Sequence, residues 1–236
     1  PFKCGPDYID TLHHSHIAGK ASINLDCWMA SQQHVTEQFN NKASLGDVAI
    51  VEGAMGLFDG ADKDQGSAAQ IARILQIPVI LVFDATAMAY SAAPLLWGLK
   101  NFDASIRIGG VIFNKVSGAA QQYFLNQAAE AAGIKVLGYL PKDDRLTLAS
   151  RHLGLTLPHE SPMTEKAQLM AQILEQYIDL EAILQMQQPI SPIVPSPISK
   201  GKLKIAIARD EAFCFFYQAN LDRLAEMGAL HFFSPL

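Results

Sequence analysis

The sequence of 236 residues contains only three cysteines, and they are scattered at Cys4, Cys27 and Cys214. This number and spacing exclude a disulfide framework and a zinc knuckle, and they favour a reducing, cytoplasmic setting. The sequence also lacks an apolar run of the roughly 20 residues that cross a membrane, and it shows no signal peptide. Its formal net charge of −5 is small, so neither a nucleic acid nor an anionic membrane is an expected partner.

The phosphate-loop pattern G-x-x-x-x-G-K-[ST] is also absent from the sequence. Taken alone, this absence argues against nucleotide hydrolysis. However, the chain begins with Pro1 rather than Met and ends inside the apolar stretch 231–236. We therefore expect a piece of a longer protein, cut at both ends, in which the domain's first strand and the phosphate loop that normally follows it would lie upstream of Pro1.

The most informative stretch that is present is DVAIVEGAMGLFDG at residues 47–60. Its apolar run at 48–51 leads directly into Glu52 and a loop with three glycines. A short continuous apolar run is typical of a strand buried on both faces, as in a parallel sheet between helix layers. Open α/β sheets bind ligands at the carboxyl ends of their strands. We expect Glu52 to lie near Mg²⁺ and phosphate, and the alternative is an ordinary loop acid.

Strand and helix patterns alternate through the rest of the first 140 residues, which predicts an α/β fold with a doubly wound, mostly parallel sheet. Strands are expected at 48–52, 78–84, 110–114 and 136–140, and helices at 31–39, 67–75, 88–99 and 121–132. This arrangement would bring Glu52, Asp84 and Asn114 to the same sheet edge.

The second half of the sequence suggests a domain boundary. Residues 161–187 have helical apolar spacing and begin with Ser-Pro, which is typical of a helix start. Residues 189–202 are rich in proline and serine and form the expected linker. A strand at 204–208 and a helix at 211–227 then begin a second α/β domain. The expected domains are therefore 1–188 and 203–236, joined by the linker 189–202.

Three histidines lie within four residues, at His13, His14 and His16. No carboxylate or cysteine spacing completes a zinc site around them. We interpret them as polar pocket or surface histidines.

Several ordered segments resemble cobyrinic acid a,c-diamide synthases. They are PFKCGPDYID at 1–10, NLD at 24–26, VEGAMGLFDG at 51–60 and RHLGL at 151–155. Residues 206–213 and 233–236 are similar to the opening of that family's glutamine amidotransferase domain. The resemblance implies a synthetase domain of the P-loop NTPase, dethiobiotin synthetase-like type, which here lacks its phosphate loop, followed by a truncated amidotransferase domain.

The resemblance implies a carbon–nitrogen ligase of cobalamin biosynthesis, with ATP and Mg²⁺ as cofactors. Its reaction would be the amidation of the a- and c-side-chain carboxylates of cobyrinate through acyl phosphates, with ammonia from glutamine. Cobyrinate and glutamine (or ammonia) are then the partners, and a homodimer is one assembly that the sequence allows. The chain alone is expected to be inactive, because the phosphate loop and the amidotransferase nucleophile lie outside it.

The resemblance also implies roles for four charged residues. Glu52 and Asp10 would hold Mg²⁺, and Asp7 and Asp10 would serve metal binding or substrate positioning. Lys3 would offset charge on the transferring phosphate, against the alternative of an exposed surface lysine.

Tyr8 would shape the corrinoid pocket, and Asn114 would hydrogen-bond the adenine base. Cys214 is expected in the first helix after the linker, as a buried packing residue without a nearby base.

Four rival functions stay open. Cobyric acid synthase is the nearest, although the run from Tyr8 to His16 favours the diamide synthase. Nickel-sirohydrochlorin a,c-diamide synthase acts on a similar polycarboxylate macrocycle. A partitioning-type nucleotide switch uses the same sheet and acids, but the linker into a second domain counts against it. The last is a binding module without catalysis.

Overall fold

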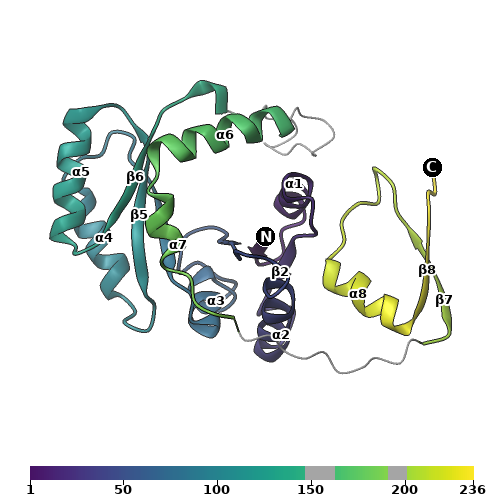
Figure 1. The fold of residues 1–236 in the computed structure, drawn as a ribbon. Coiled ribbons are helices and arrows are strands. Elements are labelled where there is room, and N and C mark those ends of the chain that lie inside the picture. Colours follow the sequence, from purple (N-terminus) through teal and green to yellow (C-terminus); the bar gives the residue numbers. More distant parts are fainter. Residues whose placement is uncertain (147–162, 191–200) are drawn as a thin grey trace. The chain divides into compact units, whose positions relative to one another are not determined.

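The computed structural model describes residues 1–146, 163–190 and 201–236 (Figure 1). They divide into two compact units. The described residues of the first are 1–71, 190 and 201–236, and those of the second are 72–146 and 163–189. The segment 151–155, the expected helix start at 161–162 and most of the expected linker lie outside the described residues.

The first unit is built on a parallel sheet of three short strands. These are β1 (Phe2–Cys4), β2 (Ile23–Leu25) and β3 (Val51–Glu52), in the order β2-β1-β3. The register places Lys3 of the central strand opposite Asn24 on one side and Glu52 on the other. Neighbouring strands lie about 4.8 Å apart, so side chains at these three positions can reach one another.

Two helices accompany this sheet, α1 (Ile9–Ala18) and α2 (Gln32–Ala43). The Ser31 hydroxyl caps α2 by accepting a hydrogen bond from the backbone N–H of His34. Val35, Phe39 and Ala43 recur every four residues and are buried on one face of α2, and the Phe39 ring centroid lies 5.0 Å from that of Phe2. This packing fixes the strand that carries Lys3.

The expected strand at 48–52 is shorter and more exposed than predicted. Only Val51 and Glu52 form β3, and Ile50 is 68% exposed. The physical reason is that β3 is the edge strand of its sheet and pairs only with β1 among the described residues. The prediction of burial on both faces is therefore wrong.

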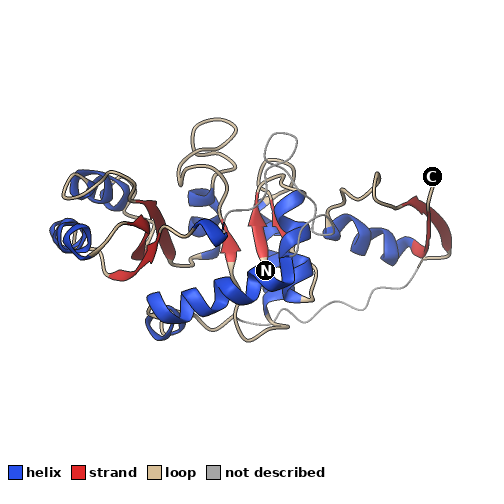
Figure 2. Cartoon of the chain, turned by 90° about the horizontal axis from the view of Figure 1, so that it is seen from above, coloured by secondary structure: helices blue, strands red, loops and turns tan. Residues whose placement is uncertain are grey.

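The second unit contains a parallel sheet with helices on both faces. Its strands β4 (Val79–Asp84), β5 (Ile108–Val116) and β6 (Val136–Pro141) pair in that order. The helices α4 (Ala92–Asn101) and α5 (Ala119–Ala131) lie together on one side of the sheet (Figure 2). On the other side, Ile178 and Ala182 pack against Ile112 and Leu137. The α/β class with parallel strands is confirmed.

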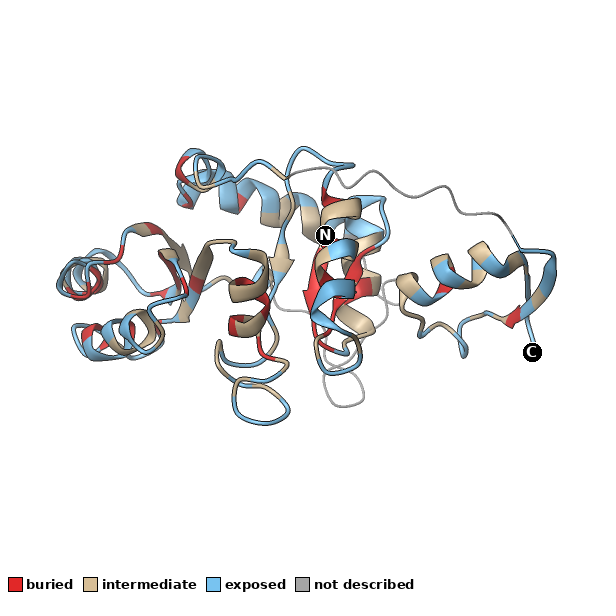
Figure 3. Cartoon of the chain, turned by 90° about the horizontal axis from the view of Figure 1, so that it is seen from below, coloured by how far each residue is buried: buried red, intermediate tan, exposed pale blue. Residues whose placement is uncertain are grey.

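The buried residues of the second unit follow the sheet and the inward helix faces (Figure 3). Phe113 of β5 is fully buried, and its ring stacks on Tyr139 with the centroids 5.8 Å apart. The helix expected at 121–132 is observed as α5, and Gly133 follows it with a left-handed φ of 63°, as predicted for a helix end. Helix α4 begins at Ala92, later than the expected residue 88.

The described strands of the two units form separate hydrogen-bonded sheets of three strands each. β3 is not paired with β4 among the described strands, because each three-stranded sheet belongs to its own unit. Helix α3 (Ala68–Leu75) contains the division between them. Asp84 and Asn114 are direct neighbours on β4 and β5, but Glu52 lies in the other sheet. The expected neighbours Asp84 and Asn114 are confirmed as a pair, and the approach of Glu52 to them stays a prediction.

The long helix predicted up to residue 187 is interrupted. It forms α6 (Met163–Tyr177) and α7 (Leu180–Leu184). Between them, Ile178 makes an isolated bridge to Gly138 of β6, and the Asp179 side chain caps α7 by accepting from the backbone N–H of Ala182. The edge of β6 thus competes with the helix for these backbone groups.

Among the described residues, no helix is both long and apolar enough to cross a membrane.

The described C-terminal segment of the first unit consists of β7 (Leu203–Ala208), α8 (Gln218–Met227) and β8 (Gly228–Phe233). β7 pairs with β8 in parallel. Strand β8 was not predicted, and α8 begins seven residues later than expected. Cys214 therefore lies in the loop before α8 rather than in a helix, and it is only half-buried.

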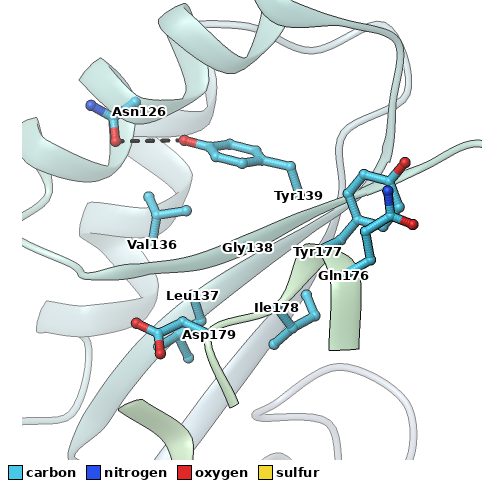
Figure 4. Close-up of a pocket in the computed structure, with 9 residues that line it drawn as sticks. All are labelled: Asn126, Val136, Leu137, Gly138, Tyr139, Gln176, Tyr177, Ile178 and Asp179. Atoms are coloured by element: carbon cyan, nitrogen blue, oxygen red, sulfur yellow. Dashed lines mark hydrogen bonds between the residues drawn. The ribbon is translucent and has the colours of Figure 1, made fainter. Parts of the chain in front are cut away.

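A pocket of about 450 Å³ lies along the exposed edge of β6, between Tyr139 and the chain at Tyr177–Asp179 (Figure 4). Gly138 at its centre has a φ of 158°, and a Cβ added there would lie 2.2 Å from the carbonyl oxygen of Tyr177. This close approach requires glycine.

Gly138→Ala is expected to lower the free energy of unfolding of the second unit by about 1–3 kcal/mol, as overpacking of a filled site does. Gly98→Ala in α4 is the matched control, because nothing lies within 4 Å of its added Cβ. The control should be neutral or stabilise by up to about 1 kcal/mol. Urea unfolding of both variants measures the difference, and equal midpoints would contradict the prediction.

Candidate active site

Three carboxylates gather around one buried ammonium group in the first unit. The Nζ atom of Lys3 lies 2.5 Å from Asp10 Oδ2, 3.2 Å from Glu52 Oε2 and 3.8 Å from Asp7 Oδ2. It also donates to the carbonyl oxygen of Gly53 at 3.2 Å. Lys3 is only 4% exposed, so it is not the surface lysine of the alternative interpretation. The structure thus brings together all four charged residues singled out in the sequence.

The elements that place these residues follow from the sheet register. Lys3 is on the central strand, and Glu52 is its neighbour on β3. Asp7 lies in the loop after β1 and caps the first turn of α1, because its Oδ1 accepts from the backbone N–H of Asp10 at 2.9 Å. Asn24 of β2 donates its amide to the carbonyl oxygens of Gly5 and Asp7 at 3.0 and 2.7 Å. The loop that carries the acids is therefore fixed from both sides.

Lys3 controls the charge state of this cluster. Burial acts to lower the pKa of Lys3, but hydrogen bonds and charge from Asp10 and Glu52 outweigh burial and raise it. Burial acts to raise the pKa of Asp10, and the contacts with Lys3 and Asp7 overcome this and lower it. The hydrogen bond from His14 is the largest influence on Glu52 and lowers its pKa, with Lys3 acting in the same direction. The ammonium and both carboxylates are thus held charged near neutral pH.

The lowered pKa values predict a loss of stability in acid. A carboxyl group whose pKa is depressed by folding stabilises the protein fully above its unfolded pKa, and the stabilisation disappears as the pH falls through the folded value. The ordinary values are 3.8 for Asp10 and 4.5 for Glu52. The melting temperature should therefore fall from about pH 4.5 downward. Thermal melts from pH 7 to 3 test this, and Asp10→Asn should show a shallower decline than the wild type.

His14 is a site residue that sequence reasoning missed. Its Nε2 lies 2.8 Å from Glu52 Oε2, and its Nδ1 lies 3.3 Å from the hydroxyl oxygen of Ser22. The available signal was helical spacing, because His14 follows Asp10 by four residues and so shares its helix face. The sequence pattern indicates the three histidines only as polar pocket or surface residues and assigns none of them a partner.

Glu52 and Asp10 have the chemistry that a magnesium–nucleotide site needs. Among the residues that the structure describes, no group of three or more His, Cys, Asp or Glu side chains has the geometry of a metal site. Mg²⁺ in nucleotide sites is held by only one or two carboxylates, with waters and phosphates completing its shell. The Glu52 and Asp10 side chains are 49% and 42% exposed, so their oxygens can reach such a shell.

Tyr8 lines a pocket of about 370 Å³ beside Asp7 and Asp10. Its ring stacks on Phe215, with the centroids 5.4 Å apart and the planes 17° from parallel. The ring centroid of Tyr217 lies 5.2 Å from that of Tyr8, and the Tyr217 hydroxyl donates to Asp26 Oδ2 at 3.1 Å. The pocket therefore joins an aromatic wall to the acidic cluster.

Asn114 lies in the second unit and does not belong to this cluster. It follows Phe113 on β5 and is opposite Asp84, whose carboxylate lies 2.7 Å from Lys115 Nζ. The hydrogen bond from Lys115 holds the pKa of Asp84 below its usual range.

Partial burial raises the pKa of the Cys214 thiol, which does not favour a reactive thiolate.

Comparison with known proteins identifies the domain family of this chain. A family model described as an AAA domain matches residues 21–150, which is more than half of the chain. The chain belongs to this AAA domain family.

The chain is also similar along its whole length to curated cobyrinate a,c-diamide synthases. It is 41% identical to the one from Caldanaerobacter subterraneus subsp. tengcongensis, 38% to the one from Gloeobacter violaceus and 39% to the one from Picrophilus torridus. Each match covers 100% of this chain and 54–56% of the relative, so the chain spans about half the length of the curated relatives it matches. The resemblance predicted from the sequence motifs is confirmed.

Proposed function

We propose that this chain supplies the synthetase part of a ligase that amidates the a- and c-side-chain carboxylates of cobyrinate. ATP with Mg²⁺ would activate each carboxylate, and glutamine would provide the ammonia. The names of the relatives support the substrate and the product. The observation that carries the proposal is the gathering of Asp7, Asp10 and Glu52 around the buried Lys3 ammonium.

The proposed chemistry overcomes a poor leaving group. Ammonia cannot displace oxide from a carboxylate, but it can displace phosphate from an acyl phosphate. Transfer of a phosphoryl group requires mainly positioning and neutralisation of charge, so the protein needs no nucleophile of its own. A bound Mg²⁺ would neutralise phosphate charge, and Glu52 and Asp10 would hold it.

The remaining side chains would position the reactants. Lys3 would place its positive charge beside the phosphate oxygens, and Asp7 would fix the first turn of α1 and orient the substrate. Tyr8 would give the macrocycle an apolar wall next to the acids. Asn114 would hydrogen-bond the adenine base from the second unit.

The domain division is part of the proposal. We assign 1–188 to the synthetase, 189–202 to a linker and 203–236 to the start of a glutamine amidotransferase domain. A cytoplasmic location fits this reaction, because ATP is available there and Cys4, Cys27 and Cys214 are free thiols.

The test is the reaction of the full-length protein that contains these residues with cobyrinate, ATP, Mg²⁺ and glutamine. Mass spectrometry of the product should show amides at the a and c positions. Amidation at the other carboxylates instead would favour cobyric acid synthase, and reaction only with nickel-sirohydrochlorin would favour its diamide synthase. ATP turnover that no polycarboxylate stimulates would favour a nucleotide switch.

A further inference from the structure

His14 contacts the Glu52 carboxylate from helix α1. It lies on the middle of α1, and its side chain is 24% exposed. Its Nε2 is 2.8 Å from Glu52 Oε2, which is shorter than the 3.2 Å from the same oxygen to Lys3 Nζ. His14 is therefore the nearer of these two donors to Glu52.

The contacts of His14 with Glu52 and Ser22 are both compatible with a proton on Nε2. The Ser22 hydroxyl lies 3.3 Å from His14 Nδ1, and Ser22 is buried and held by its backbone N–H, which donates to the Ser15 hydroxyl at 2.8 Å. A carboxylate can only accept, so the contact with Glu52 requires a proton on Nε2. Nδ1 is then free to accept from the Ser22 hydroxyl. Both contacts are satisfied by neutral imidazole.

The Glu52 carboxylate needs a hydrogen bond from another element to fix its orientation, because its own strand restrains it little. β3 has only two residues and is an edge strand, and the Glu52 side chain is half exposed. Lys3 is shared among three carboxylates and the Gly53 carbonyl. A carboxylate that binds metal usually depends on hydrogen bonds from outside the metal's own ligands to fix its orientation.

We propose that His14 is a positioning residue that orients the Glu52 carboxylate toward the metal of a bound metal–nucleotide, with Ser22 fixing the ring. This inference rests on the proposed nucleotide site but not on the identity of the amidated substrate.

The experiment measures Mn²⁺ binding by electron paramagnetic resonance, with ATP present, in the full-length protein. His14→Ala should weaken Mn²⁺ affinity about 10- to 100-fold, the range usual for loss of such outer contacts. His14→Gln should recover most of the affinity, because its amide can donate near the position of Nε2. His34→Ala is the control, since His34 is an exposed histidine of α2, and it should bind as the wild type does.

Thermal melts separate positioning from folding. A His14→Ala protein that melts as the wild type does and binds Mn²⁺ weakly supports the proposal, as does recovery in His14→Gln. Unchanged Mn²⁺ affinity in His14→Ala overturns it, and so does equal weakening in the glutamine variant. Tight Mn²⁺ binding by a wild type that forms no cobyrinate diamide would contradict the proposed function and leave the His14 result valid.

Discussion

Replacement of Lys3 by methionine is expected to remove nearly all amidation activity. The methionine side chain is similar in length and apolar character to the aliphatic part of the lysine side chain. It leaves Asp7, Asp10 and Glu52 without the cation that they share. Loss of one preorganised charge that stabilises the transition state typically lowers kcat about 10²- to 10³-fold. A larger loss is expected here, because the unpaired carboxylates also repel the phosphates.

The same substitution should lower the free energy of unfolding. Removing one partner of a fully buried ion pair costs about 3–5 kcal/mol. The carboxylates around Lys3 are one-third to one-half exposed, so solvent screens their repulsion and we expect about 1–3 kcal/mol. The loss should be smaller at pH 3 than at pH 7, because protonated carboxyl groups no longer need the ammonium.

Two controls make this prediction decisive. Lys20→Met removes an exposed lysine of the same unit and should change neither activity nor stability by a measurable amount. Lys3→Arg keeps the charge but not the compact ammonium, and it should recover stability more than activity. A Lys3→Met enzyme within tenfold of wild-type kcat would show that the cluster does not take part in the reaction.

The four charged residues of this cluster could be predicted from the sequence, but the central position of Lys3 among the three carboxylates could not. Glu52 stands out because it follows a short apolar run, where a parallel strand ends, and the family resemblance indicates Asp7, Asp10 and Lys3. The position of Lys3 among the carboxylates depends on strand order, which places β1 in the centre of the sheet, and on register, which places Lys3 opposite Glu52. Register is a tertiary property, because it is set by which faces are buried together.

The places where prediction failed share a physical cause. Helical periodicity continues through Ile178, yet the chain leaves the helix there to bridge β6 at Gly138. Likewise, the apolar run before Glu52 suits a buried strand, but β3 lies at a sheet edge. In both cases the local pattern was correct and a distant strand decided the outcome. The contact of His14 with Glu52 could not be predicted for a similar reason, since Glu52 is far along the chain.

Replacement of Glu52 by glutamine is the second change with a large expected effect. The amide has the same shape and can still accept from His14 and Lys3 through one oxygen, so the fold should be retained. It carries no charge, however, and amide oxygens are weaker ligands for a hard cation such as Mg²⁺ than carboxylates. We expect kcat to fall about 10²- to 10³-fold, with weaker Mn²⁺ binding in the presence of ATP.

Comparison of Glu52→Gln with His14→Ala distinguishes the residue that binds the metal from the residue that orients it. Removal of the charge on Glu52 should affect both metal affinity and kcat more strongly than removal of the histidine that orients it. Glu37→Gln on the exposed face of α2 should behave as the wild type. If the two site variants were reversed in severity, His14 rather than Glu52 would have to contact the metal–nucleotide, because a supporting side chain cannot contribute more than the group it supports. Metal affinities and kcat values measured on the same four proteins would therefore determine which of the two residues meets the metal.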